Sequence, residues 1–376
     1  MPKKEPKLFV GVKATSRKIF RSGMTVETIT LEDRYTNLPL VSIIVLNYNG
    51  KHHLKTCLDS LLKTDYPNFE IILVDNGSSD GSVEFVAENY PKVKILRLEK
   101  NIYTAGGYMA GVLIASGKYV AVLNNDIEVD EKWLKPLVEA LERMPWVAAA
   151  DAKYKDFYQR NKFDRSAATG RWIDYFGNNY TRGAGEPDLG QYDRPAYIMG
   201  VLTIFKRDVL LKLGGFDTSY IYGYEDIDIG WRIYLAGYKV LYVPQAVIYH
   251  KSGASTKDQR NAQRPRPEFF YLDKRNRLIT LIKNYSIPNM LSALAVALLE
   301  YYLSLWYFFL SRNKVYGLQL VRAISYLFRN LRKMMKRRAL TQQFRVRPDK
   351  DIMKYMVPYS GDIVRVLRNI FSGTFK

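Results

Sequence analysis

The sequence predicts an α/β protein whose central sheet is mixed and mostly parallel. Short apolar runs rich in β-branched residues recur between residues 41 and 123, and each is too short for a helix. Spacers of helix length separate these runs, as expected for strands joined by crossover helices. Polar loops follow several runs, and in such sheets ligands bind at the carboxyl ends of the strands.

The predicted elements follow one another closely. Strands are predicted at 41–46, 70–74, 93–98 and 119–123, and helices at 53–62, after Asp80 and at 105–115. Residues 153–194 lack lasting periodicity and are rich in Gly, Asn, Tyr and Arg, which indicates a long substrate-facing loop. A second block then has strand-like sequence at 197–205, a helix at 224–236 and a strand at 239–243.

Composition narrows the class of partner. The 376 residues carry a formal net charge of +20, which favours a polyanionic partner such as nucleic acid, an anionic membrane or a phosphate-bearing substrate. The single cysteine, Cys57, excludes an intramolecular disulfide and a cysteine-based zinc site. Residues 1–20 are basic and have no apolar core of signal-peptide length, so we expect the catalytic domain to stay in the cytoplasm.

Polar side chains gather after three of the predicted strands. Asn47 and Asn49 follow the first strand, Asp75 follows the second, and Asn125 and Asp126 follow the fourth. Each loop taken singly is explained as a turn or a helix cap, because Asn, Asp, Gly and Ser favour such backbone conformations. Three such loops at successive strand ends would nevertheless converge on one crevice, which turn chemistry alone does not require.

Three groups carry candidate chemistry. Asp126 ends a buried strand, where a carboxylate suits a hard cation such as Mg²⁺ or Mn²⁺. Glu225, Asp226 and Asp228 open a predicted helix, where they either cap it electrostatically or include a general base. His250 follows a strand-like run and is either a metal ligand beside phosphate or a satisfied structural group.

The combination of motifs identifies a family. The motifs are VSIIVLNYN at 41–49, VDNGSSDGS at 74–82, LNND at 123–126 and GYEDID at 223–228. In this order they resemble the inverting family 2 glycosyltransferases of GT-A fold, especially the rhamnosyltransferase-like branch that builds cell-surface glycans on lipid carriers. The resemblance extends from Val41 to about His250.

The resemblance implies a role for each candidate residue. Asp126 and His250 would hold Mg²⁺ or Mn²⁺, and Asp226 would be the catalytic base. From their place in the same acidic cluster, Glu225 and Asp228 are expected to orient Asp226 or to contact the acceptor. Contacts to the nucleotide sugar are expected from Asn47, Asn49, Asp75, Asn101, Gly106, Gly107 and Asn125. The glycine-rich stretch after Asn101 departs from the usual pattern at Tyr103 and Met109, so the donor stays open among UDP-, dTDP- and GDP-sugars.

The implied reaction is a single displacement at the anomeric carbon, with inversion. Asp226 would remove the proton from an acceptor hydroxyl while the nucleotide diphosphate leaves. The C-terminal region at 285–376 (the tail) and the family likeness together favour a lipid-linked glycan acceptor.

The C-terminal region has the composition of a membrane-association segment. Residues 291–310 contain Glu300 as their only charge, and their aromatic residues favour a helix lying in or dipping into the bilayer over a full span. A second helix follows, with apolar positions at Leu320, Val321, Ile324, Leu327, Phe328, Leu331, Met334 and Met335 and basic residues largely opposite. It suits the cytoplasmic surface of an anionic membrane, or packs on the catalytic domain, or dimerises.

We therefore expect three regions and weigh three other functions. The regions are a basic extension at 1–38, a catalytic domain at 39–284 and a basic, aromatic helical region at 285–376. A processive polysaccharide synthase is the first alternative, although the sequence has no Q-x-x-R-W motif. A nucleic-acid-binding protein would explain the charge, but no recognition motif is present and we expect no nucleic-acid partner. A relative that binds without catalysis would not need Asp126, Asp226 and His250.

Overall fold

The computed structural model describes residues 16–19, 25–28, 38–252, 266–311 and 313–358. The chain divides into two compact units, Met1–Pro39 and Leu40–Lys376. In the first unit, β1 (Ser16–Ile19) and β2 (Thr25–Thr28) pair antiparallel. Most of the basic extension predicted at 1–38 lies outside the described residues, as does the end of the chain after residue 358.

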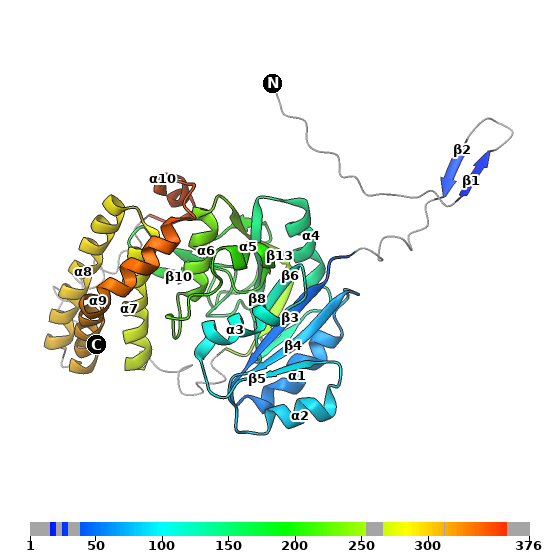
Figure 1. Ribbon diagram of the computed structural model, residues 1–376, viewed down its shortest axis with the longest axis horizontal. Helices are drawn as coiled ribbons and strands as arrows, with labels where there is room; N and C mark the ends of the chain where they lie inside the picture. The colour runs from blue at the N-terminus through cyan, green and yellow to red at the C-terminus, as the bar shows by residue number, and fades with distance from the viewer. Residues whose placement is uncertain (1–15, 20–24, 29–37, 253–265, 312, 359–376) are drawn as a thin grey trace. The chain divides into compact units, whose positions relative to one another are not determined.

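The second unit is built around a nine-stranded mixed sheet (Figure 1). Its main path runs β11-β13-β8-β12-β6-β3-β4-β5, and β7 pairs with β13. The strands are β3 (Val41–Asn47), β4 (Phe69–Asp75), β5 (Lys94–Arg97), β6 (Tyr119–Asn124), β7 (Ile127–Val129), β8 (Val147–Asp156), β11 (Ala196–Tyr197), β12 (Ile204–Lys206) and β13 (Lys239–His250). Two parallel blocks, β6-β3-β4-β5 and β8-β13, are joined by the antiparallel β12. The predicted mixed, mostly parallel sheet is confirmed.

Helices cover the sheet as the spacing predicts. They are α1 (Lys51–Leu62), α2 (Ser82–Asn89), α3 (Tyr103–Ile114), α4 (Leu134–Arg143), α5 (Arg207–Lys212) and α6 (Glu225–Leu235). The central strands have apolar side chains buried on both faces, which explains their continuous apolar sequence. Helix α6 lies so close to the chain at Met199 that a Cβ at Gly230 would stand 1.7 Å from the Met199 carbonyl oxygen. Only glycine fits there.

The last strand of the sheet is longer than the sequence predicts. The predicted strand ends at Val243, whereas β13 continues to His250. Its register against β8 shifts between Val243 and Val247, around Pro244, which lacks a backbone donor and marks an irregularity rather than a strand end. The extension pairs antiparallel with β7 and sets His250 opposite Ile127. His250 therefore lies opposite the residue that directly follows Asp126.

The long loop between β8 and β11 contains one small hairpin. Strands β9 (Arg171–Ile173) and β10 (Asn179–Thr181) pair antiparallel, and the rest of 157–195 is turns and irregular chain. The prediction of an irregular excursion at 153–194 is confirmed from residue 157 onwards, apart from this hairpin, whereas residues 153–156 belong to β8. Residues of this excursion contact both His250 and Asp226.

The C-terminal helices pack together. They are α7 (Pro267–Asn284), α8 (Ile287–Leu310), α9 (Lys314–Gln342), the short α10 (Asp349–Ile352) and the 3₁₀ helix η3 (Met353–Tyr355). Helix α7 contacts α6, α8 and α9. Three side chains near the end of α9 also cap α7: Arg338, Gln342 and Arg345 donate to carbonyls between Ile282 and Tyr285.

Helix α8 is the one described helix that is long and apolar enough to cross a membrane. One stripe of it, Ala293, Ala297, Glu300 and Tyr301, is buried. A charged side chain in the middle of a membrane-spanning helix is costly. In the structure Glu300 faces α7 and forms a buried ion pair with Arg277. Because the pair is buried between two helices, it joins the middle of α8 to α7.

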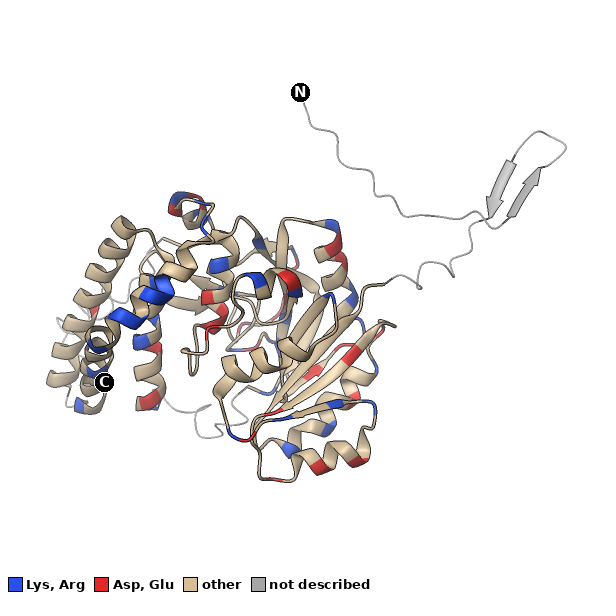
Figure 2. Ribbon diagram, in the orientation of Figure 1, with Lys and Arg blue, Asp and Glu red and all other residues tan. Residues whose placement is uncertain are grey.

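The apolar face predicted for α9 is divided in two. Leu320, Leu327 and Met334 are buried within the helical packing, whereas Val321, Phe328, Leu331 and Met335 are exposed. Exposed basic residues adjoin this open stripe, namely Arg322, Arg329, Arg332, Lys333 and Lys336. Figure 2 shows lysines and arginines recurring along α9. The alternative that α9 packs on the rest of the chain therefore holds for one half of its apolar face only.

Candidate active site

Asn47 connects three strand ends of the sheet. Its buried amide donates to Asp75 Oδ1 at 3.1 Å and to Ser78 Oγ at 3.2 Å, and its oxygen accepts from Asn125 Nδ2 at 2.6 Å. The loops after β3, β4 and β6 therefore meet, as their positions in the sheet predict. All of these contacts are within the protein, so the predicted nucleotide contacts of Asn47, Asp75 and Asn125 stay predictions.

The loops after β3 and β4 are also joined by Asn49. Its side-chain oxygen accepts from the Ser79 amide at 2.9 Å, and its own amide donates to Ser78 Oγ at 2.9 Å. Asn49 has a φ of 48°, in the left-handed region that asparagine tolerates. Asp75 Oδ2 accepts from the Ser78 amide at 3.0 Å, which closes the turn. The result is a rigid rim of backbone amides and short polar side chains.

A second polar pair extends this rim towards α3. Asn76 donates to Asn101 Oδ1 at 3.0 Å and accepts from the Ile102 amide at 2.9 Å. Asn76 is absent from the residues predicted to bind, although the motif at 74–82 contains it. A pocket of about 400 Å³ lies beside these loops and is lined by Gly77, Ser78, Arg97, Leu98 and Glu99. It is the candidate pocket for the nucleoside.

Gly106 and Gly107 have a packing explanation. A Cβ at Gly107 would lie 2.3 Å from Leu46 Cδ1, and one at Gly106 would lie 3.0 Å from Ile102 Cγ1. Glycine at position 107 lets α3 approach β3 closely. The structure thus accounts for both glycines without a ligand, and their predicted contact with the nucleotide stays a prediction.

Asp126 and His250 face each other at the junction of β7 and β13. The two atoms Asp126 Oδ1 and His250 Nε2 are 3.3 Å apart. The other ring nitrogen, Nδ1, lies 3.3 Å from Oδ1 of Asp164 and 3.1 Å from Ser252 Oγ. Asp164 is fully buried and is missed by the sequence analysis, because a single aspartate in an irregular loop has no distinguishing signal. A carboxylate on the far nitrogen of a histidine is the usual support of a metal-ligating imidazole.

The charges of this group fit a cation. Burial alone would lower the pKa of His250, but the carboxylates of Asp126 and Asp164 overcome it and raise that pKa to about 10. Burial likewise opposes ionisation of Asp126, but the nearby His250 holds the pKa of Asp126 below its ordinary value. Asp126 Oδ1 is buried and has no hydrogen-bond partner. A divalent ion would satisfy this oxygen and take the place of the imidazole proton.

Two protein ligands would leave room for others. Among the described residues, no group of three or more His, Cys, Asp or Glu side chains is arranged to hold a metal ion. The remaining ligands of a cation held by Asp126 and His250 would have to be water and phosphate oxygens, which is typical of Mg²⁺ in sites that bind nucleotides.

The acidic residues at the start of α6 divide between two roles. Glu225 and Asp226 are buried, and Glu225 Oε2 and Asp226 Oδ2 have no hydrogen-bond partner. The residue before them, Tyr224, has a φ of 71°, which starts the helix abruptly. Burial and the neighbouring Asp226 raise the pKa of Glu225 to about 7. Two crowded carboxylates with unused oxygens are suited to taking up a proton.

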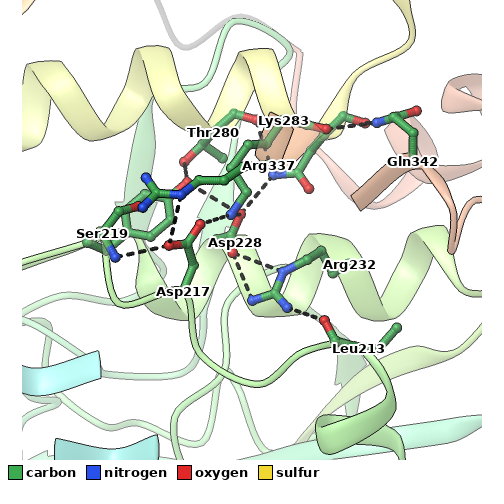
Figure 3. A network of polar contacts seen from close by, with 11 residues as sticks. Leu213, Asp217, Ser219, Asp228, Arg232, Thr280, Lys283, Arg337 and Gln342 are labelled. Carbon is green, nitrogen blue, oxygen red and sulfur yellow. Dashed lines mark hydrogen bonds and ion pairs between the residues drawn. The ribbon is translucent and has the colours of Figure 1, made fainter. Parts of the chain in front are cut away.

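Asp228 points instead into the contact between α6 and α7 (Figure 3). Its carboxylate lies 2.9 Å from Lys283 Nζ and accepts from Arg232 Nε at 3.0 Å. Lys283 also pairs with Asp217, which lies 3.9 Å from Arg337 of α9. The alternatives that Asp228 orients the base directly or contacts the acceptor do not match these contacts, because its oxygens are occupied by cations of the helical packing.

One segment of the long excursion reaches both acidic sites. Ser166 Oγ lies 3.3 Å from His250 Nδ1, and the Ser166 carbonyl accepts from Arg171 Nη1 at 3.0 Å. Arg171 Nε in turn lies 3.4 Å from Asp226 Oδ2. Burial raises the pKa of the Tyr108 hydroxyl, and the charges of Glu225 and Asp126 raise it further. The segment from Ser166 to Arg171 therefore contacts both His250 and Asp226.

The architecture defined by this sheet and site is that of the GT-A nucleotide-sugar fold. It is similar to the crystal structure of GalNAc-T7 with UDP, GalNAc and Mn²⁺, with a TM-score of 0.57 and 18% identity over 89% of this chain and 58% of that one. At that identity the likeness concerns the fold alone. The predicted fold class is confirmed.

Residues 42–214 match the family model for glycosyl transferase family 2, and the chain carries a domain of that family, as its motifs predict. The Mycobacterium tuberculosis N-acetylglucosaminyl-diphospho-decaprenol L-rhamnosyltransferase is 28% identical over 245 residues, which are 58% of this chain and 78% of the relative. The Staphylococcus epidermidis poly-β-1,6-N-acetyl-D-glucosamine synthase is 29% identical over 213 residues, 56% of this chain. The chain spans about half (49%) of that synthase.

The raised pKa of Glu225 predicts a pH-dependent stability. Because its pKa rises from 4.5 to about 7 on folding, the folded protein binds this proton more tightly than the unfolded chain. Stability should therefore fall as pH rises from about 4.5 to about 7. Glu225→Gln should remove the share of this fall that Glu225 causes and be more stable than the wild type at pH 8, by roughly 3 kcal/mol. The buried Asp151, whose pKa is also raised to about 7, keeps its own share in the variant.

Denaturant unfolding at pH 5 and pH 8 measures this difference. Glu139→Gln, on the exposed surface of α4, is the matched control and should leave the pH dependence unchanged. A Glu225→Gln variant that loses stability with pH as the wild type does would contradict the assigned burial and crowding.

Proposed function

We propose that the chain is an inverting glycosyltransferase that moves a sugar from a nucleotide diphosphate donor to a hydroxyl of a lipid-linked glycan during cell-surface polysaccharide assembly. The observation that carries the proposal is the pairing of two carboxylate sites in one compact unit, of which residues 42–214 match the family 2 model. Asp126 stands beside His250, and Asp226 stands beside Glu225 with an unused oxygen. The activity needs a cation site for the departing diphosphate and a separate base for the acceptor.

The donor would lie along the rim formed by the loops after β3, β4 and β6. The pocket beside Gly77 and Arg97 would take the nucleoside, and the diphosphate would extend towards Asp126. Asp126 and His250 would hold Mg²⁺ or Mn²⁺, which neutralises the charge of the leaving nucleoside diphosphate when bound. Asp164 keeps the imidazole oriented through its contact with Nδ1.

The acceptor hydroxyl would approach from the side of α6. Asp226 takes its proton as the acceptor oxygen bonds to the anomeric carbon, and the bond from that carbon to the diphosphate oxygen breaks with its electron pair. One displacement from the opposite face inverts the anomeric configuration. Glu225 supports Asp226 by its position one residue earlier in the same helical turn.

The acceptor class rests on two supports. The Mycobacterium tuberculosis relative is named for a diphospho-decaprenol acceptor. The tail of this chain also exposes the kind of surface that such an acceptor requires, with Tyr302, Trp306 and Phe309 on α8 and Phe328 on α9 each at least half exposed. A lipid-linked substrate is presented at a bilayer surface, so a catalytic domain attached to that surface meets it directly.

We infer that α8 and α9 attach the protein to the cytoplasmic face of an anionic membrane without spanning it. The Glu300–Arg277 pair joins α8 to α7, and burial of that pair argues for a helix that lies on the membrane rather than through it. The open apolar stripe of α9 adjoins exposed arginines and lysines, the pattern of an interfacial helix.

A processive synthase is the second candidate. The similarity to a poly-β-1,6-N-acetyl-D-glucosamine synthase favours it, but the chain covers only 49% of that relative. Mass spectrometry of the product separates the two, because a single-addition enzyme extends its acceptor by one sugar and a synthase yields a ladder of lengths.

Turnover and stereochemistry test the proposed reaction. Purified protein is incubated with Mn²⁺, a panel of nucleotide sugars and a short-chain polyprenyl diphosphate sugar acceptor, and released nucleoside diphosphate is measured. Asp226→Asn should lower kcat by a factor of about 10² to 10⁴, because it cannot take up the acceptor proton. Asp126→Asn should also require far more Mn²⁺ for half-maximal rate.

Asp59→Asn, on the exposed face of α1, is the matched control and should retain wild-type turnover. The product anomer, read by NMR, should be opposite to that of the donor. Wild-type turnover in folded Asp226→Asn, or a product with retained configuration, would contradict the proposal.

Vesicle binding tests the membrane surface. Trp306→Ser/Phe309→Ser and Arg329→Glu/Lys336→Glu should each bind vesicles containing 30 mol% phosphatidylglycerol at least about tenfold more weakly than the wild type. The reasons are lost apolar burial in the first pair and lost attraction to headgroups in the second. Only the second pair should reduce the salt dependence of binding, since Arg322, Arg332 and Lys333 remain.

Leu189→Ser is the control, because Leu189 is 84% exposed in the loop excursion, outside the tail. Co-sedimentation measures the affinity of each variant. Equal binding by all variants, or an equal loss in Leu189→Ser, would show that α8 and α9 are not the membrane surface.

A further inference from the structure

We propose that Arg171 is the positioning residue for the base: its guanidinium stabilises the negative charge of Asp226, aims the carboxylate, and ties it to the loop that supports His250. The inference rests on the proposed function, since it assigns a role at the same site. No motif in the sequence singles out Arg171, which lies in the irregular excursion.

The backbone of Arg171 is fixed beside α6. Its carbonyl accepts from the amides of Met199 at 3.1 Å and Gly200 at 3.0 Å. A Cβ at Gly200 would lie 2.6 Å from Arg171 Cβ and 3.1 Å from Asp226 Oδ2. The absence of a side chain at Gly200 therefore leaves the space in which Arg171 and Asp226 meet.

The guanidinium is held on three sides. Arg171 Nη1 donates to the Ser166 carbonyl at 3.0 Å, Nη2 donates to Asn179 Oδ1 at 3.4 Å, and Nε lies 3.4 Å from Asp226 Oδ2. A guanidinium fixed in this way presents its charge in one direction. It acts on Asp226 as a fixed cation rather than as a mobile surface side chain.

The contact between Arg171 and Asp226 is ionic without being a hydrogen bond. Arg171 Nε and Asp226 Oδ2 are both buried, and neither has a hydrogen-bond partner. A hydrogen bond to Oδ2 would use one of its lone pairs and lower its basicity towards the acceptor proton. At 3.4 Å the cation stabilises the carboxylate and leaves that oxygen available.

Arg171 supplies a positive charge beside Asp226 and Glu225. The titratable groups that act on or beside Asp226 are Glu225 from its own helix, Tyr222 from the preceding loop and Asp151 from β8. Burial would lower the pKa of Arg171, but Asp226 and Glu225 raise it, so the guanidinium stays charged. Arg171 also opposes the rise in the pKa of Glu225 that burial and Asp226 cause.

The same side chain relates the base to the proposed cation site. Ser166, whose carbonyl binds Arg171, places its hydroxyl 3.3 Å from His250 Nδ1 and 2.7 Å from Asp164 Oδ1. Displacement of Arg171 would therefore change the orientation of the Asp226 carboxylate relative to the departing diphosphate. A misoriented base lowers kcat more than it weakens donor binding.

Arg171→Gln and Arg171→Lys test this role against Arg182→Gln. Arg182 lies in the same excursion and donates to Thr169, but it has no contact with Asp226 among the described interactions. Arg171→Gln should lower kcat at least tenfold with donor KM within about twofold. The acid limb of its pH–rate profile should move up by roughly 1 to 3 units, because an opposite charge is lost.

Arg171→Lys should keep the wild-type acid limb, since it keeps the charge, and still lose kcat, since it cannot hold Ser166 and Asn179 together. Arg182→Gln should keep the wild-type acid limb. The inference is overturned if Arg171→Gln keeps both the wild-type kcat and acid limb, or if only the KM of the acceptor rises.

Stability against pH gives a readout that does not need turnover. Because Arg171 opposes the rise in the pKa of Glu225, folded Arg171→Gln should lose more stability between pH 5 and pH 9 than the wild type does. Arg182→Gln should follow the wild type. An unchanged pH dependence in Arg171→Gln would overturn the inference. A wild type inactive on every donor, with this stability difference present, would count against the proposed function alone.

Discussion

The contact of residues 164–171 with both carboxylate sites is the constraint on which the rest of the site depends. Asp164 and Ser166 fix the imidazole of His250 beside Asp126, and Arg171 stands beside Asp226. The sheet alone brings Asp126 and His250 together through the pairing of β7 with β13. Helix α6 also contacts β13, and the irregular loop adds the contact between Arg171 and Asp226 at the start of that helix.

The tail is part of the support for that arrangement. Asn276 of α7 donates to the carbonyls of Tyr222 and Gly223 at 2.9 and 2.8 Å, immediately before the acidic start of α6. Helix α9 caps the other end of α7 through Arg338. Helix α7 thus contacts both the helices that we propose to meet the membrane and the loop that precedes Asp226. Attachment to a bilayer would hold this side of the site near a lipid-linked acceptor.

The fold and the convergence of the polar loops could be predicted because they depend on local patterns. Apolar runs of fixed length specify β3, β4 and β6, and parallel strands place Asn47, Asp75 and Asn125 at one edge. Asp164 and Arg171 could not be predicted, since their positions depend on tertiary contacts of a loop without periodicity. The burial of Glu300 was missed for the same reason: a helix sequence states which residue is charged, but not that Arg277 of another helix lies opposite.

A crystal structure with Mn²⁺ and a nucleoside diphosphate tests the central claim most directly. Anomalous scattering should locate Mn²⁺ within coordination distance of Asp126 and His250, with the diphosphate completing its ligands. The carboxylate of Asp226 should face the terminal phosphate across a space of sugar size and should not bind the ion. Mn²⁺ bound elsewhere, or coordinated by Asp226, would contradict the account.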